Sequence, residues 1–384
     1  MSIFDVQHQP RAHRMVQRAL ACERTPHAYV FAGPAGVGKE MLASRLAKLL
    51  LCASPVERKL PKEVAAGWDA TAGVDACGQC EECTLFNAGT HPDFSLIHRQ
   101  LNKQHPDQQV RKRKALMLSV EVIRHFLIDR LSTSPARGRA KVFIVREAER
   151  LSESAQNSLL KSLEEPPHRT FIILLANALE RLLPTTRSRC QQVVFQTLPD
   201  AFIESQLSSL RPDAGDKASA FAARQAMGNI GTALQLIDDG VHALKTQWGE
   251  KLAELASARR GFAPTALAKP FEADAKQLAE HVKQRDPDVS DTDSTRAGLQ
   301  TLIAALASFY NDALRSATGA ALTPINADQP KIIQAIASAH TTDQLQQALR
   351  RLSEAEYHLS RNAHIELALE TLFIQLTRAA RRAA

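Results

Sequence analysis

Residues 135–190 read PARGRAKVFIVREAERLSESAQNSLLKSLEEPPHRTFIILLANALERLLPTTRSRC, and this stretch decides the fold. It holds two short apolar runs, 142–145 and 171–175, each bounded by polar residues as the buried strands of a parallel sheet are. The segment between them repeats leucines at helical spacing, and Pro166-Pro167 ends that predicted helix. Strand, helix and strand in this order predict a βαβ unit and therefore an α/β fold.

The same stretch closes on Ser188-Arg189-Cys190, which places an arginine in a polar turn. In nucleotide-binding assemblies such an arginine can reach the γ-phosphate bound by a neighbouring subunit. Together with LLKSLEEPP and LLPTTRSRC, this turn resembles the clamp-loader branch of the AAA+ ATPases. The resemblance implies that Arg189 is an arginine finger acting in trans. The alternative is a generic α/β sheet with an arginine at a solvent-facing turn, which the agreement of several signals disfavours.

Length and composition set the broad class. The chain has 384 residues, enough for two or three domains, and 44% of them are hydrophobic. No apolar run reaches membrane-spanning length and the first residues, MSIFDVQHQP, lack the apolar core of a signal peptide, so we expect a soluble, cytoplasmic protein. A net charge of +7 is mildly favourable for nucleic acid but decides nothing alone.

A phosphate-binding motif follows the first predicted strand. Gly33-Pro-Ala-Gly36-Val-Gly38-Lys39 fits GxxxxGK between a strand and a helix. The glycines let backbone N–H groups surround phosphate oxygens, and Lys39 can reach the β and γ phosphates, so ATP or ADP can still bind weakly. The next residue should be Ser or Thr to hold Mg²⁺, but it is Glu40, whose carboxylate adds negative charge there.

The second nucleotide motif is also altered. An ATP-hydrolysing enzyme carries Asp-Glu at the end of an apolar strand, where Asp supports Mg²⁺ and Glu activates water. Here residues 142–145 end in Arg146-Glu147, so a cation stands at the metal-supporting position. A segment from Gly228 to Leu234 resembles the AAA+ lid motif, and its nucleotide-facing arginine is replaced by Gly231. We therefore expect little or no ATP hydrolysis by this chain.

A cysteine cluster indicates a metal site. Cys77, Cys80 and Cys83 are separated from one another by two residues each. Cys52 lies far before them in the chain, and this long gap makes it the least certain ligand. Four thiolates predict tetrahedral zinc, because cytosolic cysteines seldom form disulfides. Buried structural thiols and an iron–sulfur cluster are the alternatives. Clamp-loader ATPase-domain subunits carry a zinc module after the phosphate-loop helix, where this one lies.

Two further stretches have a functional and a plain interpretation. His91 and Asp93 could be a catalytic pair, but we interpret them as turn and cap residues before a strand over 94–98. The basic run Arg111-Lys-Arg-Lys114 could bind DNA phosphates, but such runs are more often solvated loops. Neither stretch alone assigns a function.

The predicted organisation has three parts. Residues 1–197 form an α/β AAA+ domain, a parallel sheet flanked by helices, with a zinc module over about 52–95. Residues 198–242 form a small helical lid, and residues 243–384 form an all-α C-terminal collar interrupted by a polar linker at 285–295. Apolar residues mark two collar helices: Leu299, Leu302, Ile303, Leu306 and Phe309 for one, and Ile365, Leu367, Leu369, Leu372, Phe373 and Leu376 for the last.

The resemblance implies a subunit of the bacterial DNA polymerase III clamp loader. Its partners would be γ/τ and δ subunits in a heteropentamer, which together load the sliding clamp onto primed DNA. The chain itself would have no polymerase activity within that nucleotidyltransferase assembly. Two alternatives remain: an active γ/τ-type ATPase, and a zinc-containing DNA-binding repair or recombination protein. ATP turnover and salt-sensitive DNA binding by the isolated chain distinguish them.

Overall fold

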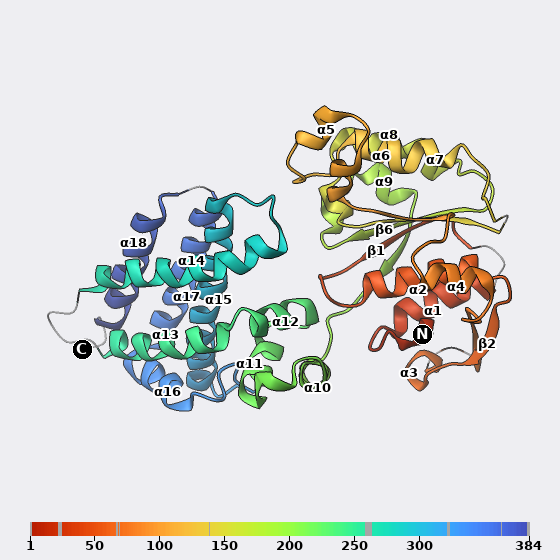
Figure 1. Ribbon diagram of the computed structural model, residues 1–384. Coiled ribbons are helices and arrows are strands. Elements are labelled where there is room, and N and C mark those ends of the chain that lie inside the picture. The colour runs from red at the N-terminus through yellow and green to blue at the C-terminus, as the bar shows by residue number, and fades with distance from the viewer. Residues whose placement is uncertain are drawn as a thin grey trace. The chain divides into compact units, whose positions relative to one another are not determined.

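The computed structural model describes residues 2–21, 25–66, 68, 70–137, 139–257, 263–320, 323–361 and 363–381. The chain divides into two compact units, Met1–Pro199 and Asp200–Ala384 (Figure 1). The first is α/β and the second is all-helical, as expected from the sequence. The further boundary at residue 242 stays a prediction.

A five-stranded parallel sheet forms the centre of the first unit, with strand order β4-β5-β6-β1-β7. Its strands are β1 (Ala28–Ala32), β4 (Phe94–Ile97), β5 (Lys141–Val145), β6 (Thr170–Ala176) and β7 (Gln191–Val194). Every residue of β1 and β5 is buried, and β6 is nearly so, because helices cover both faces. The two apolar runs of the opening stretch are therefore strands, β5 and β6, which pair with each other as the βαβ prediction requires.

Helices cover the sheet on two sides. Figure 1 shows α1, α2 and α4 on one side and α6 to α9 on the other. Their bounds are α1 (Pro10–Ala21), α2 (Lys39–Leu51), α3 (Lys62–Ala65), α4 (Glu81–Asn87), α5 (Gln108–Lys112), α6 (Val120–Ile123), α7 (Asp129–Leu131), α8 (Glu153–Glu164) and α9 (Pro184–Ser188). One continuous core joins alternate strand residues such as Phe143 and Ile172 to Leu159 and Leu163 of α8. The helix predicted between the two strands is thus α8, one of the helices that bury this face of the sheet.

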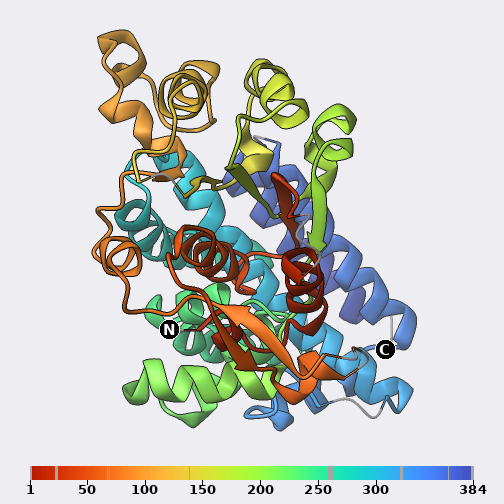
Figure 2. The same cartoon turned by 90° about the vertical axis from the view of Figure 1, so that its right-hand side faces the viewer.

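The long gap between Cys52 and Cys77 contains its own small structure. Strands β2 (Val56–Lys59) and β3 (Ala72–Asp75) pair antiparallel, outside the main sheet (Figure 2). Asp75 anchors this ribbon, because its carboxylate accepts from the backbone N–H of Ile3 at 3.1 Å and pairs with Arg58 at 2.9 Å. The ribbon's return brings Cys77 back beside Cys52.

The second unit is a helical assembly around one long helix, α15 (Asp291–Thr318). The other helices are α10 (Asp200–Leu210), α11 (Asp216–Gln225), α12 (Ile230–Asp238), α13 (Val241–Ala256), α14 (Ala268–Arg285), α16 (Pro330–Ala339), α17 (Thr342–Ser360) and α18 (Ile365–Arg381). The five apolar residues predicted to mark one helix face are all buried in α15, so that prediction is confirmed. No helix in the described part of the chain is long and apolar enough to cross a membrane.

The polar linker predicted at 285–295 is shorter in the structure. The connection between the two helices covers only residues 286–290, because α14 continues to Arg285 and α15 begins at Asp291 with Ser290 as its N-cap. Ser and Asp are common in loops but are also preferred at helix N-termini, where the Ser290 hydroxyl accepts from the N–H of Asp293. The apolar residues predicted to mark the last helix all lie in α18, where Leu367 is 62% exposed and the buried ones are Leu369, Leu372, Phe373 and Leu376.

Candidate functional site

The phosphate-loop glycines adopt conformations that other residues avoid. Gly33, Gly36 and Gly38 have φ of 151°, 69° and 97°, in the range that favours glycine. A Cβ on Gly33 would lie 2.7 Å from the carbonyl oxygen of Phe195. The loop therefore has the shape that the motif predicts, between β1 and α2 at the carboxyl edge of the sheet.

Lys39 is held by its own loop. Its Nζ donates to the carbonyl oxygen of Gly33 at 2.7 Å, to that of Pro34, and to Oδ1 of Asn177 at 2.9 Å. Only 7% of the residue is exposed, and burial lowers the pKa of Lys39 to about 8. The ammonium predicted to reach phosphates is thus engaged by carbonyl and amide oxygens of the protein.

Glu40 and Arg146 form an ion pair across the site. Nε of Arg146 donates to Oε2 of Glu40 at 2.8 Å, and Nη2 donates to Oε1, so the contact is bidentate. The two residues lie 106 positions apart in the chain, at the start of α2 and just after β5. The two departures predicted separately from the sequence therefore meet in one ion pair.

Glu147 is also committed to partners. Its backbone is left-handed, with φ of 48°, and its carboxylate pairs with Arg99 and Arg150, each at 3.0 Å. Glu149 accepts from the backbone N–H of Asn177 at 3.2 Å and from its side-chain amide at 2.8 Å. Sequence analysis missed Asn177, although a polar residue directly after buried β6, beside β1, is a signal for this edge.

Arg189 lies just after α9 and is about a third exposed. Its Nε donates to Oε1 of Glu164 at 2.5 Å, and Nη1 donates to the carbonyl oxygen of Thr185 at 2.9 Å. Gly231 lies in the first turn of α12, in the second unit. Sequence analysis did not identify Glu164 as a partner of Arg189, although both belong to the opening stretch.

The four predicted metal ligands come together. Their sulfur atoms all lie within 4.8 Å of one another, and Cys52 Sγ is 3.6 Å from Cys77 Sγ and 3.9 Å from Cys80 Sγ. A tetrahedral Zn²⁺ with bonds of about 2.3 Å needs sulfur atoms about 3.8 Å apart, so the geometry fits. Cys52 ends α2, whereas Cys80 caps α4 and Cys83 lies in its first turn.

Backbone N–H groups support this cluster. The N–H of Cys77 lies 3.3 Å from Cys52 Sγ, and that of Cys80 lies 3.3 Å from Cys77 Sγ. The backbone hydrogen bond from Gln79 lowers the pKa of the Cys77 thiol to about 6. Burial raises the pKa of the Cys52 and Cys83 thiols instead. Only the thiolate coordinates, so a metal ion would have to displace their protons. The distances between the four sulfur atoms indicate that the cluster could hold a metal ion.

His91 and Asp93 are structural, as interpreted from the sequence. The Asp93 carboxylate accepts from the N–H of Ala136 at 2.7 Å and of Arg137 at 2.8 Å, which fixes the loop before β5. His91 lies 2.9 Å from Glu82, which also pairs with Arg137. The side chains of His91 and Asp93 are both buried. The basic run 111–114 is exposed, at the end of α5 and in the loop after it.

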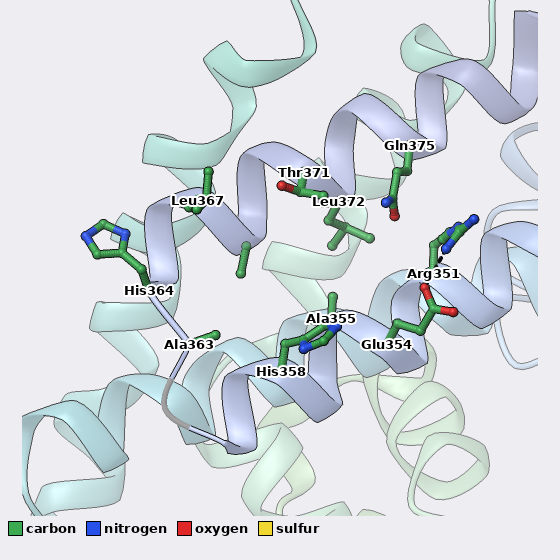
Figure 3. Close-up of a pocket in the computed structure, with 11 residues that line it drawn as sticks. Arg351, Glu354, Ala355, His358, Ala363, His364, Leu367, Thr371, Leu372 and Gln375 are labelled. Atoms are coloured by element: carbon green, nitrogen blue, oxygen red, sulfur yellow. Dashed lines mark hydrogen bonds and ion pairs between the residues drawn. The ribbon is translucent and has the colours of Figure 1, made fainter.

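A pocket of about 220 Å³ lies in the second unit (Figure 3). Residues of α17 such as His358 face residues of α18 such as Thr371 and Leu372 across it, and exposed Leu367 lies at its edge. Arg351 pairs with Glu354 at 2.7 Å.

Comparison with known proteins gives a consistent family. A family model described as DNA polymerase III, delta subunit, matches residues 8–199, half of the chain. A second, described as DNA polymerase III, delta subunit, C terminal, matches residues 294–378. The two matches fall in the first and the second compact unit respectively.

Curated relatives agree with these models. The DNA polymerase III subunit delta' of Pseudomonas aeruginosa is 34% identical over 62% of this chain and 64% of its own. That of Escherichia coli K12 is 32% identical over 56% and 55%. Subunit tau of E. coli is 31% identical over 62% of this chain and 32% of its own. The chain thus spans between half and two thirds of the delta' relatives named here. The chain belongs to the DNA polymerase III delta' subunit family.

Proposed function

We propose that this chain is a clamp-loader subunit that does not hydrolyse ATP itself and supplies Arg189 to an ATP site on a neighbouring subunit. The observation that carries the first half is the ion pair between Glu40 and Arg146. An ATP-hydrolysing site uses these two positions to hold Mg²⁺, which bridges the β and γ phosphates and neutralises developing charge. A guanidinium held there by a carboxylate repels a divalent cation.

The neighbouring groups support the same conclusion. Lys39 must leave three oxygen partners before it can reach a phosphate, and Glu147 must leave two arginines before it can activate water. Contributions within one catalytic site are not additive, so each change alone is enough to slow hydrolysis strongly. Weak nucleotide binding without turnover is compatible with this arrangement.

Arg189 supports the second half of the proposal. It lies at the end of a short helix, and its guanidinium is partly exposed rather than buried in the core. A planar fork of fixed positive charge suits the spread charge of a transferring phosphoryl group. The receiving site would belong to a γ/τ-type subunit, which with a δ subunit completes the heteropentamer that loads the sliding clamp onto primed DNA.

The cysteine cluster is proposed to hold one structural Zn²⁺ through Cys52, Cys77, Cys80 and Cys83. Four thiolates leave no open coordination position, so the metal would stabilise the fold rather than take part in catalysis. Its position between the end of α2 and the start of α4 supports that role.

ATP turnover by the isolated chain tests the proposal. We expect no Mg²⁺-dependent turnover above that of a Lys39→Ala control, together with co-purification with γ/τ-type and δ subunits. The similarity to tau makes an active γ/τ-type ATPase the alternative. Robust turnover that Lys39→Ala abolishes would establish that alternative.

A further inference from the structure

The guanidinium of Arg189 is bound on two of its edges within its own chain. Glu164, the last residue of α8, accepts from Nε at 2.5 Å and also from Nη2. The carbonyl oxygen of Thr185, one helical turn earlier in α9, accepts from Nη1 at 2.9 Å. Arg189 therefore does not extend freely into solvent.

Part of this guanidinium is still unused. A guanidinium carries five N–H bonds: one on Nε and two on each terminal nitrogen. Glu164 contacts Nε and Nη2, and Thr185 accepts from Nη1. One hydrogen therefore remains on each terminal nitrogen, and a phosphate oxygen of a neighbouring subunit could accept from it.

A partly buried hydrogen bond holds together the two helices that flank the Glu164–Arg189 pair. Gln156 of α8 is buried, and its Oε1 accepts from the backbone N–H of Leu183 at 2.8 Å. The same oxygen lies 3.5 Å from the hydroxyl of Thr186, which is fully buried in α9. Gln156 therefore ties the helix that carries Glu164 to the helix that precedes Arg189, which holds the backbones of the two residues near each other.

We propose that Glu164 is a positioning residue, which holds the guanidinium of Arg189 so that its remaining N–H groups can meet a neighbour's phosphate. This inference rests on the proposed function of Arg189. Holding a charged group in place before the reaction removes the cost of ordering it in the transition state. The opposite role, in which Glu164 withholds Arg189 from the neighbour, predicts faster turnover once the carboxylate is removed.

The test compares ATP turnover of the reconstituted clamp loader containing Glu164→Gln, Glu165→Gln or Arg189→Ala. Glu165→Gln is the matched control, because it removes the same charge from the adjacent exposed residue, whereas the carboxylate that pairs with Arg189 is that of Glu164. We expect Glu164→Gln to lower kcat about tenfold with little change in the KM for ATP, since misplacing a catalytic group by about 1 Å costs up to about a hundredfold. Glu165→Gln should leave kcat unchanged.

The double variant Glu164→Gln/Arg189→Ala separates positioning from loss of structure. If Glu164 acts through Arg189, the double variant turns over ATP at the rate of Arg189→Ala alone, whereas an independent structural defect lowers it further. Equal kcat for the Glu164 and Glu165 variants, or a rise with Glu164→Gln, overturns this inference and leaves the proposed function standing. Normal turnover with Arg189→Ala overturns the proposed function itself.

Discussion

Glu40 and Arg146 form an ion pair beside the phosphate loop. Each position is predictable from its motif, because GxxxxGK fixes the start of a helix and an apolar run fixes the end of a strand. Their contact is not predictable from local pattern, since 106 residues separate them. The two replacements compensate each other in charge, so the site is not left with an isolated carboxylate beside an isolated guanidinium.

Because Glu40 and Arg146 pair with each other, we predict that the effects of substituting them on the free energy of unfolding are not additive. Both are nearly half exposed, so solvent screening limits the interaction to about 1 kcal/mol or less. We expect the destabilisation by Glu40→Ala and Arg146→Ala, measured by urea unfolding, to be smaller in the double variant than the sum of the single effects. Strict additivity would show that the pair does not form in solution.

A second residue-level prediction concerns a buried ion pair in the second unit. Lys245 has no exposed side-chain surface, and its Nζ lies 2.8 Å from both oxygens of Asp328. Burial raises the pKa of Asp328, but hydrogen bonds from Lys245 and His242 outweigh it and hold the pKa below its usual value. Removing the carboxylate by Asp328→Ala leaves a buried cation unpaired, and we expect a loss of about 3–5 kcal/mol in unfolding free energy at pH 7.

The pH dependence of this pair checks the cause. Because the folded pKa of Asp328 is depressed, its stabilising contribution is present above its unfolded pKa near 4 and is lost as pH falls through the folded value. The stability difference between the wild type and Asp328→Asn should therefore shrink below about pH 4. The variant Lys245→Met/Asp328→Asn should recover much of the loss. A constant difference down to pH 2 would contradict the assignment.

At the scale of elements, periodicity predicted most of the framework. Strands β5 and β6, helix α8 and the apolar face of α15 follow from short buried runs and helical spacing. The antiparallel ribbon of β2 and β3 could not be predicted, because its residues are largely polar and its pairing depends on the fold. The bounds predicted for the polar linker, 285–295, are too wide for a chemical reason: the same Ser and Asp side chains cap helices and fill loops.

The cysteine cluster joins the end of α2 to the start of α4, and we predict that it binds zinc. We expect about one equivalent of zinc in the purified chain, lost on Cys80→Ser together with a marked fall in melting temperature of the first unit. Cys190→Ser is the control, because Cys190 is a buried thiol of the same unit that does not belong to the cluster. Zinc below about half an equivalent, with free thiols at all four cysteines of the cluster, would refute the site.

At the scale of the whole molecule, family membership and the residues of the site both agree with the proposed clamp-loader subunit. The chain belongs to a family whose curated members include DNA polymerase III delta' subunits, and it is also similar to tau. Glu40 and Arg146 form an ion pair beside the phosphate loop, and the partly exposed Arg189 is held by Glu164 just after α9. The division of labour between subunits that we propose would account for both features.

The most direct test of this account is ATP turnover by the complete clamp loader, with clamp and primed DNA, when it contains either wild-type chain or Arg189→Ala. The account predicts that the variant assembles normally and that turnover falls at least tenfold, as loss of a charge-stabilising arginine requires. Arg181→Ala, an exposed arginine of the same unit, should have no effect. Unchanged turnover in an intact complex with Arg189→Ala would contradict the account.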